Sequence, residues 1–250
     1  MTYVLGDVHG RALPYHRMLD FINFSDSDTL YVLGDMIDRN PDGIRLLKEV
    51  MDAKNIHMLL GNHEHMMLHA IEAPKGTCCN GRDTNRTLWY YNKGKITEEK
   101  FREEPEEVQK KILDFIRNLP VNIPIENNGR KILLIHGSPL EWAKQLHYAL
   151  EMYGEDPVAF AVWDRIYAYT KNPDVPYDLV LAGHTPTVQY QNNDPMEFYK
   201  DGKFMFLDCG CAYGNQFHGQ LGCLCLETME EFYVPCEEGN MKFLHKQRGK

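Results

Sequence analysis

Oxygen and imidazole side chains recur at the ends of apolar runs in this chain of 250 residues. The run Leu30-Tyr31-Val32-Leu33 leads into Gly34, Asp35, Asp38 and Arg39. Such a run before glycine predicts a buried strand, so these polar residues follow the point where the strand leaves its sheet. Four further segments repeat the plan and carry Asp7 and His9, Asn62 and His63, His136, and His184. Because α/β sheets bind ligands at the carboxyl ends of their strands, one shared site is expected.

Six of these side chains form a ligand set of oxygen and imidazole donors without a thiolate: Asp7, His9, Asp35, Asn62, His136 and His184. This mixture suits divalent transition metals, with manganese first and iron or zinc as alternatives. Asp7, Asp35 and Asn62 are 28 and 27 positions apart, about one βαβ repeat, which predicts neighbouring parallel strands. The central one, Asp35, is the expected bridge between two ions about 3.5–4 Å apart. Solvent held between two cations ionises near neutrality and is the expected nucleophile, so no side-chain nucleophile is required.

Five segments resemble, in order, the motifs of the phosphoprotein-phosphatase branch of the calcineurin-like metallophosphoesterases, as found in bacterial and phage serine/threonine phosphatases. They are Gly6-Asp7-Val8-His9-Gly10, Gly34-Asp35-Met36-Ile37-Asp38-Arg39, Gly61-Asn62-His63-Glu64, His136-Gly137 and Gly183-His184. The resemblance implies an α/β fold, a four-layer αββα sandwich of two mixed β-sheets flanked by helices. It also implies Asp7, His9 and Asp35 on one metal ion, and Asp35, Asn62, His136 and His184 on the other.

The same resemblance implies roles for the remaining motif residues. His63, supported by Asp38, would protonate the leaving oxygen, while Arg39 and Asn62 would bind the substrate phosphate. This agrees with general chemistry, since a histidine held by a carboxylate is a good general acid and arginine is a bidentate phosphate ligand. Trp163-Asp164-Arg165 matches the place of a second phosphate-binding arginine, so Arg165 takes that role; a plain exposed helix residue is the alternative. Asn40 replaces the glycine that usually ends the second motif, and its tolerance of positive φ is expected to preserve the turn.

The chain reads as one domain over residues 1–250, with a helical insertion at about 74–120 that contains a charged amphipathic stretch from Glu98 to Leu119. Asn128-Gly129 between two apolar runs predicts a β-hairpin. Helices are expected over residues 140–152 and 158–169, before an antiparallel, β-rich close.

Composition narrows the functional classes. The formal net charge is −9 and no Lys/Arg-rich block is present, which disfavours a nucleic-acid partner. No leader-like or membrane-length apolar segment is visible, so we expect a cytoplasmic protein without a membrane partner. Seven cysteines are an odd number and predict reduced thiols.

Two patterns outside the motifs carry alternative interpretations. His65 and His69 have the i, i+4 spacing of a metal pair, but ordinary helix residues are the better interpretation. Four late cysteines, Cys209, Cys211, Cys223 and Cys225, could form a zinc site, although burial in core strands explains them better.

The sequence therefore predicts hydrolysis of phosphomonoesters by a metal-bridging hydroxide, with a protein serine/threonine phosphatase as the first hypothesis and a phosphorylated protein or peptide as substrate. The alternative is a bis(5'-nucleosyl)-tetraphosphatase or a small-molecule phosphoesterase. A non-catalytic binding protein of the same fold is third, and the retained general acid argues against it. Glutamates between Glu98 and Glu107 would repel a tetraphosphate if they faced the metals, which favours the phosphatase hypothesis.

Overall fold

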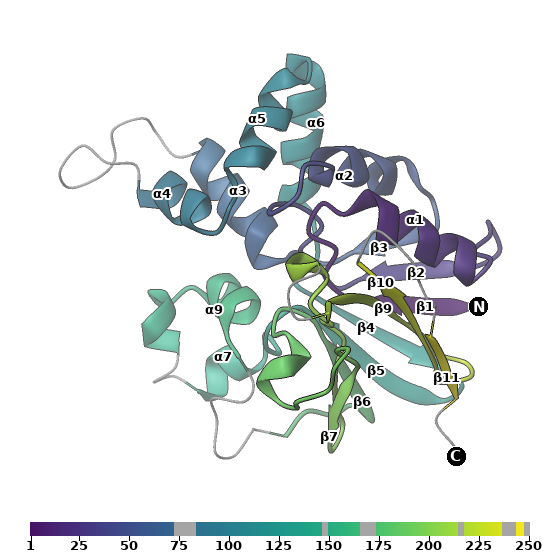
Figure 1. The fold of residues 1–250 in the computed structure, drawn as a ribbon. Coiled ribbons are helices and arrows are strands. Elements are labelled where there is room, and N and C mark those ends of the chain that lie inside the picture. Colours follow the sequence, from purple (N-terminus) through teal and green to yellow (C-terminus); the bar gives the residue numbers. More distant parts are fainter. Residues whose placement is uncertain (73–83, 147–149, 166–173, 215–217, 237–243, 248–250) are drawn as a thin grey trace.

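Two β-sheets stack at the centre of the protein, with helices on both outer faces (Figure 1). The computed structural model describes residues 1–250 except 73–83, 147–149, 166–173, 215–217, 237–243 and 248–250. The layers run helix, sheet, sheet, helix, which confirms the predicted four-layer αββα sandwich.

The first sheet has the strand order β11-β10-β9-β1-β2-β3. Its strands are β1 (Thr2–Leu5), β2 (Thr29–Val32), β3 (Ile56–Met58), β9 (Gln220–Cys225), β10 (Glu230–Pro235) and β11 (Leu244–Gln247). β1, β2 and β3 are parallel, with Val4 beside Tyr31 and Val32 beside Met58. β9 pairs antiparallel with β1, so a strand from the C-terminal part of the chain lies beside the N-terminal strand. The parallel trio confirms the βαβ repeat expected from the spacing of Asp7, Asp35 and Asn62.

The second sheet has the order β4-β5-β6-β8-β7. Its strands are β4 (Asn122–Asn127), β5 (Arg130–Ile135), β6 (Leu179–Ala182), β7 (Tyr199–Asp201) and β8 (Phe204–Phe206). β5, β6 and β8 are parallel, and β4 and β7 close the edges antiparallel. Asn128 and Gly129 both have positive φ, at 50° and 74°, as a two-residue hairpin turn requires. The predicted hairpin is confirmed.

Helices pack on the outer face of each sheet. α1 (Ala12–Phe21), α2 (Gly43–Asp52) and α3 (Asn62–Glu72) cover the first sheet. α7 (Trp142–Gln145), α9 (Pro157–Trp163) and the 3-10 turn η1 (Glu151–Tyr153) lie on the second, and two further 3-10 turns are η3 (Thr187–Gln189) and η4 (Cys211–Tyr213).

The prediction of two long helices after β5 is wrong in their lengths. The chain leaves the helical conformation at Leu146, and residues 147–149 lie outside the described part. α9 begins where Asp156 accepts the N–H of Val158 at 2.9 Å. It ends because Asp164 turns to extended backbone, with ψ of 154°, and its buried carboxylate accepts the hydroxyl of Ser138 at 2.5 Å. The expected continuation beyond residue 165 lies outside the described residues.

The predicted insertion is helical in the part that the structure describes; its residues 74–83 lie outside that part. It forms α4 (Thr84–Tyr91), α5 (Lys95–Glu103) and α6 (Glu106–Arg117), which project above the first sheet in Figure 1. The stretch expected as one amphipathic segment from Glu98 is two helices. Glu104 and Pro105 are both extended, with ψ of 148°, because the residue before a proline avoids helical conformation.

Apolar side chains from both sheets interdigitate between them. Val4, Leu33 and Leu224 of the first sheet meet Leu134 and Leu181 of the second, and all five are fully buried. This inter-sheet cluster holds the two sheets in register and so sets the position of the loops at their strand ends.

We predict that Leu134→Ala lowers the free energy of unfolding by about 2–5 kcal/mol, because it opens a cavity in the inter-sheet cluster. Urea denaturation measures the change. Leu13→Ala is the matched control, since Leu13 is 44% exposed on α1 and its truncation should cost less than about 1 kcal/mol. Equal losses for the two variants would show that the inter-sheet cluster is not a major source of stability.

Candidate metal centre

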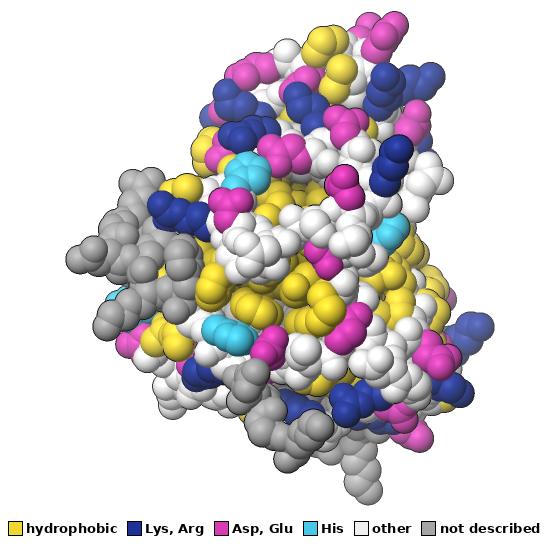
Figure 2. All heavy atoms as spheres, turned by 90° about the vertical axis from the view of Figure 1, so that its right-hand side faces the viewer, with side chains coloured by type: hydrophobic (Ala, Val, Ile, Leu, Met, Phe, Trp, Pro, Cys, Tyr) yellow, Lys and Arg dark blue, Asp and Glu magenta, His cyan; other side chains and the backbone are white. Residues whose placement is uncertain are grey.

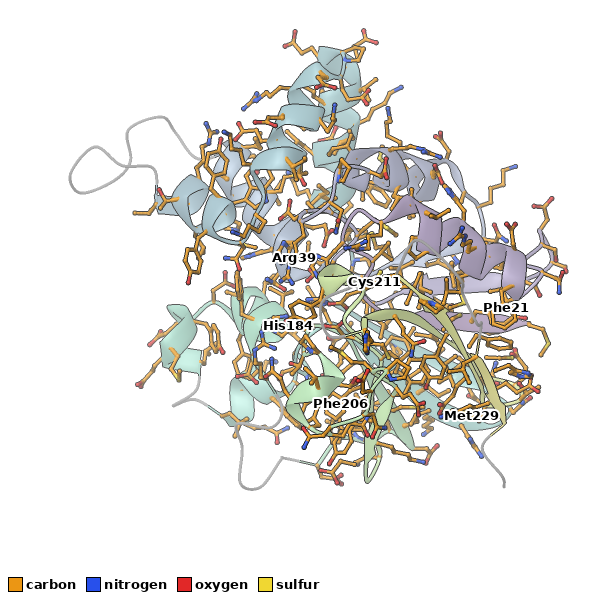
Figure 3. All side chains as sticks on the ribbon, in the orientation of Figure 1. Phe21, Arg39, His184, Phe206, Cys211 and Met229 are labelled. Atoms are coloured by element: carbon orange, nitrogen blue, oxygen red, sulfur yellow. The ribbon has the colours of Figure 1, made fainter. Side chains whose placement is uncertain are left out.

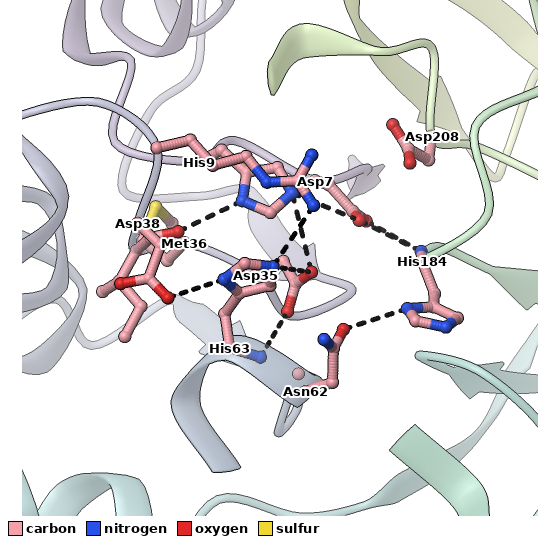
Figure 4. A network of polar contacts seen from close by, with 12 residues as sticks. Asp7, His9, Asp35, Met36, Asp38, Asn62, His63, His184 and Asp208 are labelled. Carbon is pink, nitrogen blue, oxygen red and sulfur yellow. Dashed lines mark hydrogen bonds and ion pairs between the residues drawn. The ribbon is translucent and has the colours of Figure 1, made fainter. Parts of the chain in front are cut away.

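The six predicted ligands meet where parallel strands of both sheets end, and all of them except His136 are labelled in Figure 4. Asp7, His9 and Asp35 follow β1 and β2, and Asn62 opens α3 just after β3. The other two ligands, His136 and His184, follow β5 and β6 of the second sheet. All six are buried.

The carboxylate of Asp35 is the centre of this cluster. Its Oδ2 lies 3.6 Å from His9 Nε2, and its Oδ1 lies 3.3 Å from His136 Nε2. Asp7 Oδ2 lies 4.0 Å from His9 Nε2, and both oxygens of Asp7 accept the backbone N–H of His184. Asp35 thus faces histidines from both sheets, the position expected of a bridging ligand.

Backbone carbonyls fix which ring nitrogen of each histidine carries its proton. His9 and His136 donate from Nδ1 to the carbonyls of Ile37 and Leu33, at 3.1 and 2.7 Å. His184 donates from Nε2 to the carbonyl of Trp163 at 3.0 Å. A carbonyl oxygen only accepts, so the imidazole must be the donor. The opposite nitrogen of each ring is left with a lone pair that points into the cluster.

These lone pairs converge on oxygen atoms that are also acceptors. Asn62 Oδ1 lies 3.0 Å from His136 Nε2 and 2.9 Å from His184 Nδ1. Burial lowers the pKa of both rings, which keeps them neutral, so no proton separates the three acceptors. A cation between them satisfies all three at once. The donor set therefore fits divalent metal ions, and two groups, His9-Asp35-His63 and Asp35-His136-His184, have side-chain atoms close enough to hold one.

His63 and Asp38 form a buried pair beside the cluster. His63 donates from Nδ1 to Asp38 Oδ2 at 2.6 Å. Burial opposes a positive charge on the ring, but the carboxylates of Asp35 and Asp38 outweigh it and raise the pKa of His63. Its Nε2 lies 3.3 Å from Arg39 Nη2 and 3.9 Å from Asp35 Oδ2, so the Nε2 edge of the ring faces the ligand cluster. This geometry suits a general acid.

A buried carboxylate, Glu64, holds the loop that carries Asp35, Asp38 and Arg39. Those three residues all have positive φ, at 48°, 69° and 67°, which costs energy for non-glycine residues. Glu64 accepts four backbone N–H groups, from Asp35, Met36, Ile37 and Gly61, at 2.9–3.2 Å. Burial and the neighbouring Asp35 raise the pKa of Glu64 to about 8, while the His63 ring and the N–H of Ile37 act in the opposite direction. The sequence marks Glu64 only as the last residue of the third motif, and the structure makes it the clamp of this loop.

The two predicted phosphate-binding arginines contact different loops of the cluster: Arg39 lies near His63, and Arg165 bonds the loop of His184. Arg39 and His184 both lie at the junction of the helices and sheets in Figure 3. Arg165 donates from Nη1 to Thr185 Oγ1 at 2.9 Å and to the carbonyl of His184 at 3.4 Å, which ties it to a metal-ligand loop.

The expectation that Asn40 preserves the turn by adopting a positive φ is wrong. It does not take the left-handed conformation; Asp38 and Arg39 do. The side-chain amide of Asn40 instead donates to the carbonyl of His9 at 2.8 Å, which joins the first two motif loops.

Sequence reasoning did not single out three residues near the cluster. Asp208 follows β8 and is buried, which raises its pKa to about 6, although the N–H of Gly210 opposes the shift. The strand-end rule used for the other motifs could have found it. Trp89 and Thr97 of the insertion contact Asp38, donating to Oδ2 and accepting its backbone N–H. No local signal marks these two, because their role depends on how the insertion folds back.

The patterns with alternative interpretations form no metal site in the described part of the chain. The rings of His65 and His69 lie 4.3 Å apart, without a third histidine, cysteine or carboxylate placed to complete a site. Five late cysteines are buried and form no disulfide: Cys209, Cys211, Cys223, Cys225 and Cys236. Cys78 and Cys79 lie outside the described residues. No helix within the described ranges combines the length and apolar character that a bilayer crossing requires.

Comparison with known families decides the class of this centre. The family model for calcineurin-like phosphoesterases matches residues 2–205. The chain belongs to this family. Calcineurin-like phosphoesterases are metal-dependent hydrolases of phosphoesters, as the ligand set requires.

Two curated relatives share one description. The symmetrical bis(5'-nucleosyl)-tetraphosphatase of Delftia acidovorans is 30% identical over 152 residues, 59% of this chain and 48% of that protein. The chain thus spans about half the length of this relative. The protein of the same description from Chromobacterium violaceum is 22% identical over an alignment that covers 94% of this chain and 95% of that one.

Solved structures confirm the fold. A putative diadenosine tetraphosphatase superposes with a TM-score of 0.58 and 19% identity, over 94% of this chain and 92% of that one. A protein serine/threonine phosphatase from Saccharomyces cerevisiae gives 0.54 and 14%, over 100% and 80%.

We predict that the protein binds two divalent metal ions and that Asp35→Asn weakens both, because Asp35 faces ligands of both groups. Elemental analysis and calorimetric titration with Mn²⁺ measure the stoichiometry. A single ion per chain, or full activity after thorough chelation, would contradict the binuclear centre.

We also predict that Glu64→Ala lowers the free energy of unfolding by about 2–4 kcal/mol, because four buried N–H groups lose their acceptor. Metal affinity should fall in parallel, since the Asp35 loop loses its clamp. Glu64→Gln keeps the size of the side chain and one acceptor oxygen. Its stability and metal affinity should therefore lie between those of Glu64→Ala and the wild type. Unchanged stability and metal affinity in Glu64→Ala would exclude the clamp.

Proposed function

We propose that the protein hydrolyses dinucleoside polyphosphates, with diadenosine tetraphosphate as the reference substrate, at the candidate metal centre. The observation that carries the proposal is a basic, aromatic cleft of about 1560 Å³ that includes Arg39. Its lining residues are Arg11, Arg39, Asn40, Tyr90, Tyr91, Asn92, Lys93, Lys95, Ile96, Glu99, Ala212 and Tyr213.

The charges of the cleft suit a polyphosphate chain. Arg11, Arg39, Lys93 and Lys95 give four cations against a single carboxylate, Glu99. Glu99 is itself near Lys95, at 3.7 Å. A substrate that extends several phosphates beyond the reacting one could contact these cations, whereas a phosphomonoester uses only the groups at the metals.

Aromatic side chains in the same cleft suit nucleobases. Tyr90, Tyr91 and Tyr213 line it, and Tyr91 is 83% exposed, so its ring face is open for stacking. Stacking on a tyrosine is worth about 1–3 kcal/mol per base and tolerates different bases. A phosphopeptide has no nucleobase to stack on these tyrosine rings.

The glutamates of the insertion do not oppose this proposal. Glu98 is buried and pairs with Arg86 and Arg102, and the carboxylates of Glu103 and Glu104 pair with Lys100 and Lys48. Figure 2 shows lysine and arginine side chains interspersed with acidic ones over the upper part of the molecule. For Glu98, Glu103 and Glu104, the expectation of repelling a tetraphosphate therefore loses its basis. The names of the two curated relatives support the same substrate type.

The mechanism follows from the ligand geometry. Divalent ions held by the six ligands would supply Lewis acidity and an activated water. Arg39, near His63, and Arg165, on the His184 loop, would orient the reacting phosphate. His63 would then donate its Nε2 proton to the leaving oxygen, with the proton on Nδ1 kept in the bond to Asp38.

Phosphomonoester hydrolysis, including a phosphoprotein substrate, remains the second candidate, and the His63–Asp38 pair favours it. An alkoxide leaving group needs a proton from a general acid, whereas the leaving group of a phosphoanhydride departs more easily. The pair therefore equips the centre for both classes of substrate.

We predict that kcat/KM for diadenosine tetraphosphate exceeds that for a serine phosphopeptide in the presence of Mn²⁺. Removing both cleft lysines, in Lys93→Ala with Lys95→Ala, should raise KM for the dinucleotide about 5–50-fold and leave 4-nitrophenyl phosphate hydrolysis near its wild-type rate. The effect should shrink as salt screens the cleft.

Lys100→Ala is the matched control for this experiment, because Lys100 is exposed, pairs with Glu103 and does not line the cleft. It should leave both substrates unaffected. A phosphopeptide that proves the better substrate would overturn the proposal in favour of the phosphatase, and equal losses on the dinucleotide and the aryl phosphate would remove the cleft from substrate binding.

A further inference from the structure

The insertion is hydrogen-bonded to the general-acid pair through an indole. Trp89, near the end of α4, donates from Nε1 to Asp38 Oδ2 at 2.8 Å. Trp89 and Asp38 are both fully buried. Asp38 Oδ2 also accepts the N–H of His63, so one oxygen atom receives both donors.

All side-chain hydrogen bonds of Asp38 in the described structure use this one oxygen. Asp38 Oδ1 is buried without a hydrogen-bond partner among the described residues. The indole N–H only donates, so it can bond Asp38 only as an acceptor. Without Trp89, His63 would be the one side-chain hydrogen-bond partner of the carboxylate among the described residues.

The backbone around Trp89 is shaped to admit the indole edge. A Cβ atom on Gly94 would overlap the Nε1 and Cδ1 atoms of Trp89. Gly94 has φ of −73° and ψ of −11°, a conformation that alanine adopts without strain, so contact with the indole is the constraint at this position. Thr97, three residues later, accepts the backbone N–H of Asp38 at 3.0 Å. The insertion thus holds Asp38 at both its side chain and its backbone.

We propose that Trp89 is a positioning residue whose indole N–H fixes the Asp38 carboxylate and, through it, the orientation in which His63 presents Nε2 to the leaving oxygen. This inference rests on the general-acid role of His63 in the proposed function. It gives the insertion a part in the chemistry in addition to lining the cleft.

Trp89→Phe tests the proposal, because it keeps a buried aromatic ring and removes the N–H. It should lower kcat about 10-fold for phenyl phosphate, whose leaving group needs a proton, and less than about 2-fold for 4-nitrophenyl phosphate. KM and the bound metal should stay at wild-type values. A loss of equal size on the two substrates would mean that Trp89 acts only on stability or on the metals, and would overturn the proposal.

A double-mutant cycle separates the indole from the acid. His63→Asn alone should lower kcat about 10²–10⁴-fold on phenyl phosphate and less on 4-nitrophenyl phosphate. In that background Trp89→Phe should add less than about a 2-fold loss, because the group it positions is absent. Equal losses from His63→Asn on both substrates would remove the acid role itself. A His63→Asn effect that depends on the leaving group, together with a Trp89→Phe effect that does not, would overturn only the role of Trp89.

Two further variants guard against misfolding. Gly94→Ala keeps the indole chemistry but displaces the ring, and should reproduce the leaving-group-dependent loss. Trp142→Phe trims another fully buried tryptophan, which packs against Phe204 at the second sheet with 5.7 Å between ring centroids, and should keep wild-type ratios between the two substrates. If Trp142→Phe changes this ratio as Trp89→Phe does, general loosening explains both and the proposal fails.

Discussion

The acceptor atoms at the junction of the two sheets depend on cations. Asn62 Oδ1 and the lone-pair nitrogens of His136 and His184 lie about as far apart as hydrogen-bonded atoms, yet none has a proton to share. The proton of each ring is committed to a backbone carbonyl. Each sheet contributes part of this acceptor cluster. Stacking the two sheets therefore brings the acceptors together and creates the need for positive charge between them. The rest of the site is arranged around that demand.

The insertion changes how this centre meets a substrate. Trp89 and Thr97 bond Asp38, and Tyr90, Tyr91 and Lys93 line the cleft only a few residues away. One short segment therefore contacts both the acid pair and the surface on which a substrate would lie. A relative with the same five motifs and a different insertion would keep the metal chemistry and meet a different set of substrates.

Much of the fold could be predicted because its signals are local. Apolar runs followed by glycine and a ligand marked strand ends such as those at Asp35 and His184, and Asn128-Gly129 marked a hairpin. Helix lengths after β5 could not be predicted, because apolar spacing near Val158 does not reveal that Asp164 turns away to meet Ser138.

The ligand set of the candidate site was predictable for the same reason, since each member closes a strand. The supporting groups were not. Glu64 and Trp89 act on Asp35 and Asp38 from 29 and 51 positions away, so their roles exist only once the chain has folded. The glutamates of α5 likewise led to the prediction of a repulsive acidic surface, because charge along a sequence does not show which carboxylates have cationic partners.

The order of the strands has a consequence for assembly. Asp7, Asp35 and Asn62 belong to the first quarter of the chain, and His136 and His184 belong to the second half. Ions held between them would act as a reversible cross-link between the two halves, closing loops that span from 74 positions, Asn62 to His136, up to 177 positions, Asp7 to His184. Tying together parts so distant restricts the unfolded chain more than a local tie does, in the way a disulfide closing a long loop does. The described cysteines form no disulfide, so bound metal ions would stabilise the fold as a cross-link in addition to their role in catalysis.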